Sequence, residues 1–476
     1  MNNTNRIVAE FMEGRVLIEG NNQQCPRIQA QNWKNTKSGL LAVRELALKD
    51  RKQQFTNLLH HINEELLRES FFKLKKNSAA GVDGVSWYDY AVDLDRNISQ
   101  LHQLVKNGRY KPKPARRVYI PKEDGSQRPL SIICMQDKIV QQAMVTVLNQ
   151  IYEVDFLGFS YGFRPGKSQH DALDSLHYGI MNRKVNWVLD LDISKFFDTV
   201  EHDWLIRFIQ HRVGDKRIIR LVTQWIKVGT VNEHGQRIQS LIGTPQGAVI
   251  SPLLANIYLH YSFDLWVNKC RKGARGDIVV VRYADDSVLG FQKYQDAATF
   301  LRLLKIRLGK FGLKVHQDKT KLLRFGRFAP MQCAEKPSRG RPGTFDFLGF
   351  THYLGRKSNG DVTVIRKTKR GRIITQLKRI KMELRKRLHD KPSKTGLWLR
   401  KVIQGHINYY GVPFNSRAVG CFVYEATRLW IKSLRRRSQR HNMNWKRFNI
   451  LTRRWIPTPE TVHPYPEQRF RAKHLR

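Results

Sequence analysis

Residues 278–291 read IVVVRYADDSVLGF, and the interpretation of the whole chain depends on this stretch. Two apolar runs, 278–281 and 288–291, flank a short polar segment, and the β-branched residues of the first run favour a strand. The pattern predicts a β-hairpin with Asp285 and Asp286 at its turn. Aspartate-rich turns are common, so the pair by itself has an ordinary structural explanation. Two adjacent carboxylates between buried strands are costly, however, unless a cation neutralises them.

A second acidic segment, residues 186–198, reads NWVLDLDISKFFD. Apolar residues at 189, 191 and 193 alternate with polar residues at 190, 192 and 194, which is the period of a strand. Aspartate is disfavoured in strands, although an aspartate facing solvent on an edge strand is unremarkable. If this strand lies beside the hairpin, Asp192, Asp285 and Asp286 would converge. Such an oxygen-rich set suits Mg²⁺, and two ions about 3.5–4 Å apart would support phosphoryl transfer.

Composition indicates a folded protein with a polyanionic partner. The chain has 476 residues, 41% of them hydrophobic, and a net charge of +45. Residues 351–476 carry 32 lysine and arginine residues against 6 aspartate and glutamate residues. Nucleic acid is the leading partner and a membrane surface is the rival. No apolar run is long enough to span a membrane, and the first residues lack the apolar core of a signal peptide, so we expect a cytoplasmic protein. The five cysteines form no C-x-x-C pair, which argues against a zinc finger and a disulfide framework.

Residues 110–129, YKPKPARRVYIPKEDGSQRP, predict a hairpin that turns at Asp124-Gly125. Lys122 and Arg128 lie on either side of that turn. The hairpin is either a solvated surface feature or a flap that lays cations over phosphates. Residues 160–168, SYGFRPGKS, do not form a nucleotide-binding P-loop, because only three residues separate the two glycines.

The remaining patterns are mostly helical. Residues 55–66 have apolar side chains at helical spacing, and a loop containing Gln246 leads into a helix that opens at Ser251-Pro252. Beyond residue 372 we expect basic amphipathic helices throughout, followed by an extended proline-containing tail. Arginines interleaved with Trp and Tyr suit RNA grooves and unpaired bases.

These motifs together resemble those of the group II intron-encoded reverse transcriptases, also called maturases. The similarity includes AGVDGVSW, IPKEDGSQRPLSI, SYGFRPGKSQHDAL, LDLDISKFFD, GTPQGAVISPLLANIYLH, YADD at 283–286, KVHQDKTK, FDFLGF, GHINYYG and VHPYPEQRF. These motifs follow one another along the chain in the order of the family. The resemblance implies an α/β right-hand polymerase whose antiparallel palm sheet packs on helices. It implies an N-terminal extension at 1–50, fingers and palm at 51–355, a helical thumb or maturase domain at 356–450 and a basic tail at 451–476.

The resemblance also implies roles for individual residues. Asp192, Asp285 and Asp286 match the catalytic metal-binding triad, and the Ile193 carbonyl is expected as a further ligand. Phe197 matches the aromatic gate that excludes a 2′-hydroxyl. Core packing is the alternative for Phe197, but we expect the neighbouring Phe196 to fill that role. Asp190 is given a structural role. Lys122, Arg128, Gln246 and Lys319 match nucleotide-binding positions. The primer grip would comprise Phe347, Leu348 and Gly349. The expected RNA-binding residues are Arg379, Arg385, Arg387, Arg435, Arg436 and Arg437.

The implied protein is an RNA-directed DNA polymerase that uses Mg²⁺, with Mn²⁺ as a substitute. Its partners would be intron RNA, target DNA, a DNA primer and dNTPs, but no membrane. It would assist splicing and retrotransposition in a bacterial, nucleoid-associated setting, and a homodimer is left open. The sequence lacks the Cys- and His-bearing endonuclease of many relatives, so we expect a borrowed primer.

Departures from the usual family motifs occur at Ser131, Ile133, Cys134 and Ala248, and they concern fine positioning rather than the chemistry. The alternatives are a bacterial reverse transcriptase that serves defence or spacer acquisition and a non-catalytic RNA-binding splicing factor.

Overall fold

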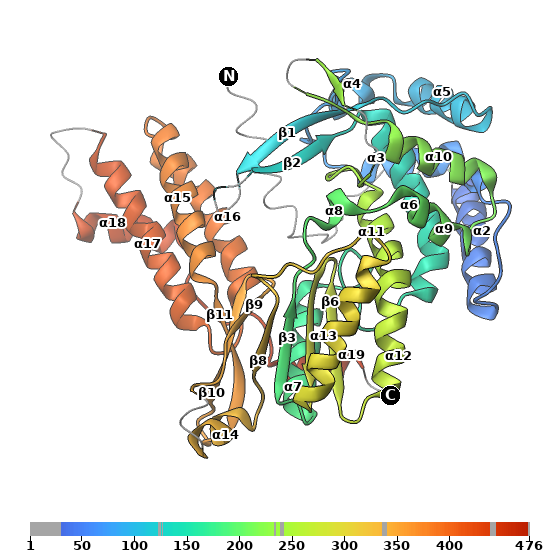
Figure 1. Cartoon of the computed structure of the whole chain (residues 1–476). Helices are drawn as coiled ribbons and strands as arrows, with labels where there is room; N and C mark the ends of the chain where they lie inside the picture. Colours follow the sequence, from blue (N-terminus) through green and yellow to red (C-terminus); the bar gives the residue numbers. More distant parts are fainter. Residues whose placement is uncertain are drawn as a thin grey trace.

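The computed structural model describes residues 30–121, 125, 127–232, 235–238, 242–335, 340–437 and 444–474. Its centre is a four-stranded antiparallel sheet in the order β6-β7-β3-β8. The strands are β3 (Trp187–Leu191), β6 (Ile278–Tyr283), β7 (Asp286–Phe291) and β8 (Lys321–Arg324). Helices lie on one side of this sheet and a separate helical lobe lies on the other (Figure 1).

The hairpin predicted at residues 278–291 is confirmed. Strands β6 and β7 pair from Ile278 opposite Phe291 to Tyr283 opposite Asp286, so the turn consists of Ala284 and Asp285. Ala284 has a φ of 57°, in the left-handed region that non-glycine residues rarely adopt. Asp285 therefore lies in the turn, whereas Asp286 is the first residue of β7.

Both faces of the central sheet are covered, which the alternating pattern of β3 only partly indicated. Leu189 and Leu191 belong to a core shared with α6 (Met135–Asp155) and α11 (Ser251–Leu259). Val188, on the face that also carries Asp190, packs in a second core with α7 (Gln169–Asn182). The face of β3 that carries Asp190 is therefore apolar near the beginning of the strand, at Val188.

Further helices surround the first core. They are α2 (Ala30–Lys49), α3 (Glu64–Lys73), α4 (Trp87–Val92), α5 (Leu94–Lys106), α8 (Phe196–Thr199), α9 (His202–Gln210), α10 (Lys216–Lys227), α12 (Leu265–Gly273) and α13 (Tyr294–Gly309). Helix α14 (Ala329–Glu335) follows β8 and lies outside this core. A π-helical turn, η2 (His260–Asp264), joins α11 to α12. In the described part of the chain, no helix is both long enough and apolar enough to cross a bilayer.

The helix predicted over residues 55–66 is mostly wrong. Phe55 forms a parallel bridge with Val213, a 3-10 turn, η1, spans Leu59–His61, and α3 begins only at Glu64. The Asp215 carboxylate accepts the backbone N–H groups of Leu58 and Leu59 at 2.9 and 3.1 Å. A distant side chain therefore satisfies backbone groups that a helix would have bonded internally.

Two further sheets accompany the central one, and they have four and three strands. The predicted hairpin near residue 125 is confirmed as β1 (Ala115–Pro121) and β2 (Gln127–Ile132), which β4 (Thr230–Val231) and β5 (Arg237–Ile238) extend in the order β2-β1-β4-β5. Strands β9 (Phe345–Phe347), β10 (Phe350–Arg356) and β11 (Val362–Thr368) form the third sheet.

The helical lobe follows β11, as the sequence predicted. It comprises α15 (Arg370–Lys386), α16 (Pro392–Tyr410), α17 (Ser416–Arg435) and α18 (Trp445–Trp455), around a core that includes Leu399, Phe422 and Trp430. The tail was expected to be extended, but α19 (Pro466–Lys473) is helical. Its proline occupies the first helical turn, where the missing N–H carries no penalty.

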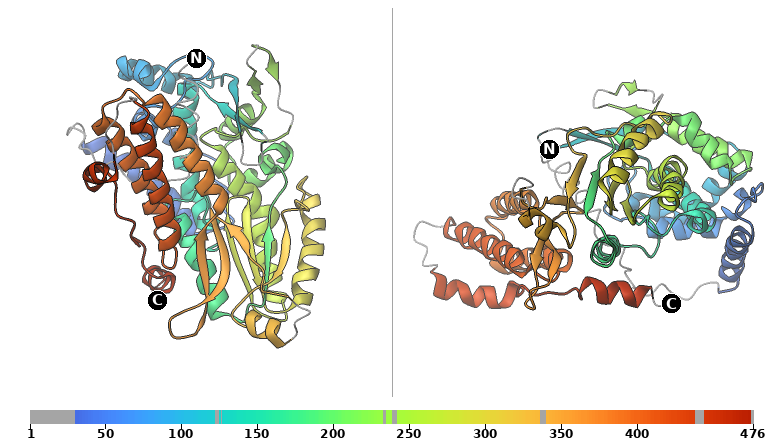
Figure 2. Two further views of the ribbon diagram at one scale, coloured as in Figure 1. Left: turned by 90° about the vertical axis from the view of Figure 1, so that its left-hand side faces the viewer. Right: turned by 60° about the horizontal axis from the view of Figure 1, so that its bottom comes forward.

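Residues 456–474, here called the C-terminal strap, connect the lobe to the central sheet. Helix α19 packs beside α7, and a connecting segment separates it from α18 (Figure 2). The N–H groups of Val462 and His463 donate to the Gly411 carbonyl at the end of α16. Phe470 stacks on Tyr178 of α7 with ring centroids 4.3 Å apart.

Candidate active site

The first candidate residue, Asp192, directly follows β3 and is held by the segment 314–320. Its carbonyl accepts the N–H of His316 at 2.8 Å, and its own N–H donates to the Thr320 hydroxyl at 3.3 Å. The Lys319 ammonium lies 3.6 Å from the Asp192 carboxylate. Ile193, whose carbonyl was expected as a metal ligand, is buried and pairs with Val315. The KVHQDKTK motif therefore braces the end of β3.

Strand register brings the end of β3 beside the start of β7. Leu191 pairs with Ser287, so the next residues in each direction, Asp192 and Asp286, lie at the same end of adjacent antiparallel strands. Asp285 precedes Asp286 in the hairpin turn. The three aspartates are thus contributed by two neighbouring strand ends, although they are 93 residues apart in sequence.

A fourth carboxylate, that of Asp190, has a pKa shifted by the charges at this edge of the sheet. Burial, followed by the charges of Asp286, Asp346 and Asp192, raises the pKa of Asp190 to about 7, and Lys321 opposes the shift. A carboxylate whose pKa is raised by neighbouring carboxylates lies close enough to them to be repelled. This edge of the sheet is therefore an acidic surface in a strongly basic protein.

The oxygen ligands at this edge suit a divalent cation, although the carboxylate side chains are not gathered around a single point. Carboxylate and backbone carbonyl oxygens are the ligands that Mg²⁺ and Mn²⁺ accept, and the mutual repulsion around Asp190 is of the kind that a cation relieves. Within the described ranges, no three Asp, Glu, His or Cys side chains are already gathered as a ligand set. Asp192 instead faces the Lys319 ammonium.

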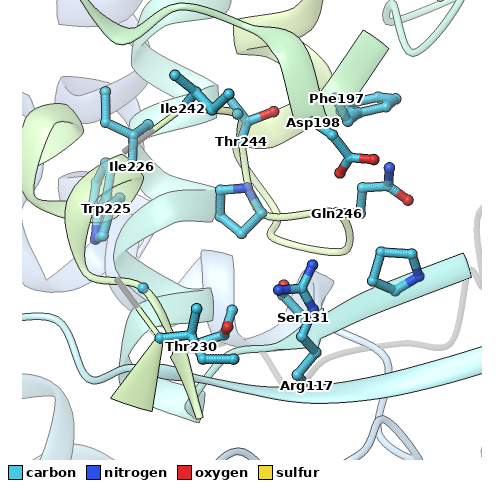
Figure 3. A pocket seen from close by; sticks show the side chains of 15 residues that line it. Arg117, Ser131, Phe197, Asp198, Trp225, Ile226, Thr230, Ile242, Thr244 and Gln246 are labelled. Atoms are coloured by element: carbon cyan, nitrogen blue, oxygen red, sulfur yellow. The ribbon is translucent and has the colours of Figure 1, made fainter. Parts of the chain in front are cut away.

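A cavity of about 290 Å³ lies between α8, α10 and the β1–β2 sheet (Figure 3). Phe197 and Gln246 line it together with Arg117, and Phe197 is half-buried whereas the adjacent Phe196 is almost fully buried. Trp225 and other apolar residues of α10 line the opposite wall. The structure therefore brings two of the predicted nucleotide-binding residues to one cavity.

The loop that carries Gln246 is fixed against β2. The Gln246 carbonyl accepts the N–H of Ser131 at 2.6 Å. A Cβ on Gly247, whose φ is 104°, would lie 2.8 Å from the Ser131 carbonyl oxygen. Only glycine fits there, because other residues would meet both strain and a backbone clash.

The other predicted nucleotide-binding residues are not gathered at this cavity. Arg128 lies exposed on β2, opposite Ile120, and Lys319 lies beside Asp192. Lys122 is outside the residues that the structure describes.

The predicted primer-grip residues form the tight turn between β9 and β10. Leu348 and Gly349 have φ values of 48° and 80°, and the side chains of Phe347 and Leu348 are buried. The Leu348 carbonyl accepts the Tyr409 hydroxyl of α16 at 2.8 Å. These side chains join the third sheet to the helical lobe, because they share a core with Tyr409 and Tyr410.

The predicted RNA-binding arginines differ in exposure. Arg385 and Arg436 are exposed, whereas the other four are half-buried. Two of the half-buried arginines, Arg387 and Arg437, have contacts within the lobe. Arg387 lies over the Trp398 ring at 4.9 Å and near Glu383 and Asp390, and Arg437 donates to the Asp390 carbonyl.

Comparisons with known proteins agree with this architecture. The family model described as reverse transcriptase (RNA-dependent DNA polymerase) matches residues 120–352. Protein YkfC of Escherichia coli strain K12 is 36% identical over 273 residues, which cover 51% of this chain and 71% of YkfC. The group II intron-encoded protein LtrA of Lactococcus lactis is 33% identical over 228 residues, or 46% of this chain and 37% of LtrA. The chain belongs to the group II intron-encoded reverse transcriptase family.

The similarity to two of the relatives covers only part of their length. A 91 kDa protein in the cob intron of Schizosaccharomyces pombe is 31% identical over 278 residues, which cover 56% of this chain and 34% of that protein. The chain thus spans about a third of this relative and of LtrA, but most of YkfC. The family assignment confirms the resemblance inferred from the motifs.

One group of buried polar residues was missed in the sequence of this reverse transcriptase. Arg282, Asp264 and Asn256 are buried together beneath the Ala284–Asp285 turn. The position of Arg282, directly before YADD, was visible. Its buried partners lie 18 and 26 residues away and have no shared pattern.

Proposed function

We propose that this protein is an RNA-directed DNA polymerase that binds its own group II intron RNA, assists its splicing and copies it into DNA. The observation that carries the proposal is the register of β3 and β7, which sets Asp192 beside Asp286 at one strand edge. That arrangement occurs in a chain of the reverse transcriptase family. Acidic strand ends of this kind hold divalent cations in phosphoryl-transfer enzymes.

In this proposal the chain forms a right hand. Fingers and palm occupy residues 51–355, the thumb or maturase domain occupies 356–450, and 1–50 and 451–476 are flanking segments. The central sheet would be the palm, the β1–β2 hairpin a finger and α15–α18 the thumb. The lobe's excess of positive charge would bind RNA phosphates.

Residues of the site would then have distinct tasks. Asp192, Asp285, Asp286 and the Ile193 carbonyl would hold Mg²⁺, which supplies charge stabilisation for the attacking and leaving oxygens when bound. Arg128 and Lys122 would neutralise the triphosphate, and Phe197 would occupy the space of a 2′-hydroxyl. The backbone at Phe347, Leu348 and Gly349 would position the primer strand. The Lys319 ammonium would leave its ion pair with Asp192 and bind a phosphate of the substrate instead.

Primer extension on an RNA template tests the proposal. The double variant Asp285→Asn/Asp286→Asn keeps side-chain shape but removes two charges, and we expect extension to fall at least about 1000-fold. Binding of the RNA template, measured by fluorescence anisotropy, should stay within about threefold because the basic lobe is untouched.

Asp318→Asn serves as the matched control, because it removes an exposed carboxylate from the neighbouring 314–320 segment. It should retain nearly full extension. Equal extension by the double variant and the wild type would overturn the assignment. RNA binding without extension by the wild type itself would favour the non-catalytic splicing factor.

A further inference from the structure

A fully buried arginine lies directly beneath the candidate catalytic turn. Arg282 is on β6, and its guanidinium forms an ion pair with Asp264, whose side chain is also buried. Asp264 is the last residue of the π-helical turn η2. Short π-helical segments are costly and occur frequently at functional sites. A buried ion pair offers little net stability, so it invites a functional explanation.

Every N–H donor of the Arg282 side chain is used. Nε and Nη2 donate to the Asp264 carboxylate at 2.7 and 2.5 Å. Nη2 also donates to the Ser160 hydroxyl at 2.7 Å, and Nη1 donates to the Asn256 side-chain oxygen at 3.0 Å. The remaining Nη1 donor reaches the Ala284 carbonyl at 2.9 Å. Arginine has five such donors, so the contact with the turn is one arm of a saturated network.

The Ala284 carbonyl belongs to the peptide that links Ala284 to Asp285, at the centre of the two-residue turn. Ala284 is held at a φ of 57°, which an alanine seldom adopts unless its surroundings impose it. A flip of the central peptide would turn this carbonyl away from the guanidinium. It would also reorient Asp285, because the same peptide plane carries its N–H group. The Arg282 bond therefore opposes reorientation of Asp285.

The backbone of Gly162 also packs against the turn. A Cβ on Gly162 would lie 2.3 Å from the Ala284 nitrogen, so the two backbones are in direct contact. The Asn256 side chain donates to the Gly162 carbonyl at 2.7 Å while its oxygen accepts from Arg282. One network thus fixes both the turn and the segment packed against it.

We propose that Arg282 is a positioning residue, which holds the Ala284–Asp285 peptide so that Asp285 and Asp286 keep the orientation needed for nucleotide addition. Asp264 fixes the guanidinium, and Asn256 couples it to Gly162. This inference rests on the proposed polymerase function. It assigns Arg282 no contact with substrate, because the side chain is fully buried.

The test compares the wild-type full-length protein with Arg282→Lys, which keeps the charge but cannot bond Asp264, Asn256, Ser160 and Ala284 together. A second variant, Arg282→Met/Asp264→Leu, removes both charges and leaves no orphaned carboxylate. For each we would measure the folded fraction by circular dichroism, kcat per folded molecule, the half-saturating Mg²⁺ concentration and template affinity. We expect kcat to fall about 10- to 100-fold, the half-saturating Mg²⁺ concentration to rise several-fold, and template affinity to be unchanged.

The matched control is Arg212→Met/Asp155→Leu. In this pair Arg212 is buried and Asp155 is largely buried, the N and O atoms are 3.1 Å apart, and the structure gives no contact between the pair and the turn. It should lower thermal stability while kcat per folded molecule and Mg²⁺ dependence stay at wild-type values.

The inference is overturned if the Arg282 variants lose activity only in proportion to their folded fraction, or if they match the control in Mg²⁺ dependence. Either Arg282 variant alone suffices for this comparison if the other does not fold. Failure of the wild-type enzyme to extend a primer would instead overturn the proposed function, so the two failures are distinguishable.

Discussion

Arg366 and Asp174 are 192 positions apart, yet the Arg366 guanidinium donates to the Asp174 carboxylate at 2.9 Å inside the protein. Arg469 of the C-terminal strap donates to the second oxygen of the same carboxylate. The carboxylate of α7 is therefore shared by β11 and α19. This shared carboxylate joins the central sheet, the third sheet and the strap.

Removing the strap's part in this arrangement should destabilise the protein. Arg469→Met leaves one carboxylate oxygen and the half-buried His463 ring without their donor, and we expect a loss of about 2 kcal/mol in the free energy of unfolding. Thermal unfolding followed by circular dichroism measures the loss. Arg471→Met, an exposed charge on the same helix, should change stability by less than about 0.5 kcal/mol. Equal effects of the two variants would contradict a structural role for the strap contact.

Phe197 should control the choice between deoxyribose and ribose. Phe197→Ala opens space at the cavity that also contains Gln246, and we expect the preference for dNTP over NTP to fall about 10- to 100-fold. Single-nucleotide incorporation with each substrate gives the ratio. Phe196→Leu, at the buried neighbouring ring, should cost about 1–3 kcal/mol of stability and leave the ratio unchanged. An unaltered ratio in Phe197→Ala would mean that this ring only packs the core.

Buried histidines should make the helical lobe sensitive to acid. Burial lowers the pKa of His406 to about 3, and its ring stacks on Phe422 with centroids 3.7 Å apart. The folded state therefore keeps His406 neutral, whereas the unfolded state binds a proton below a pH of about 6.5. The stability contributed by the neutral ring is complete above that pH and is lost as the pH falls.

His406→Phe removes this titration and keeps an aromatic ring. Between pH 7.5 and 5 the stability of the variant relative to wild type should improve by about 2 kcal/mol. Denaturant unfolding at both pH values provides the comparison. His389→Gln, at an exposed histidine, should show almost no such change. A parallel pH dependence in wild type and His406→Phe would disprove the neutral buried state.

Arginines of the lobe should separate by function. Arg385→Ala removes an exposed charge, so the slope of log affinity for RNA against log salt should become shallower by about 0.7–0.9. Arg387→Ala removes the cation that lies over Trp398, and we expect a stability loss of about 1 kcal/mol. RNA titrations at several salt concentrations and thermal unfolding distinguish the two. The division is wrong if Arg385→Ala leaves the slope unaltered.

Local sequence patterns predicted the elements that depend on local forces. The hairpin 278–291 followed from its two apolar runs, and α11 followed from Ser251-Pro252 after a glycine-containing loop. The order β6-β7-β3-β8 could not be derived, because no local pattern specifies which strand lies beside the hairpin. The prediction that Asp192 lies near Asp286 depended on that strand order, so it could be made only on the condition that β3 pairs with the hairpin.

The errors had one physical cause, which is tertiary competition for local groups. The apolar spacing of residues 55–66 suggested a helix, but Asp215 captured the N–H groups of Leu58 and Leu59. The prolines of the tail suggested extension, but Pro466 begins a helix that packs on α7. The role of Arg282 could not be predicted for a related reason. Its hydrogen-bond partners Asp264, Asn256 and Ser160 are contributed by other segments of the chain.

The shared carboxylate also sets an order of events during synthesis. Arg469 follows Asp174 by 295 residues, so a ribosome adding about 5–20 residues per second needs about 15–60 s to supply it. During that interval the nascent α7 exposes Tyr178, whose ring Phe470 later covers. The central sheet can therefore form before α19 has been synthesised, and during that period one side of α7 is exposed to solvent. A molecule that binds the nascent chain would have to cover this side until α19 is made.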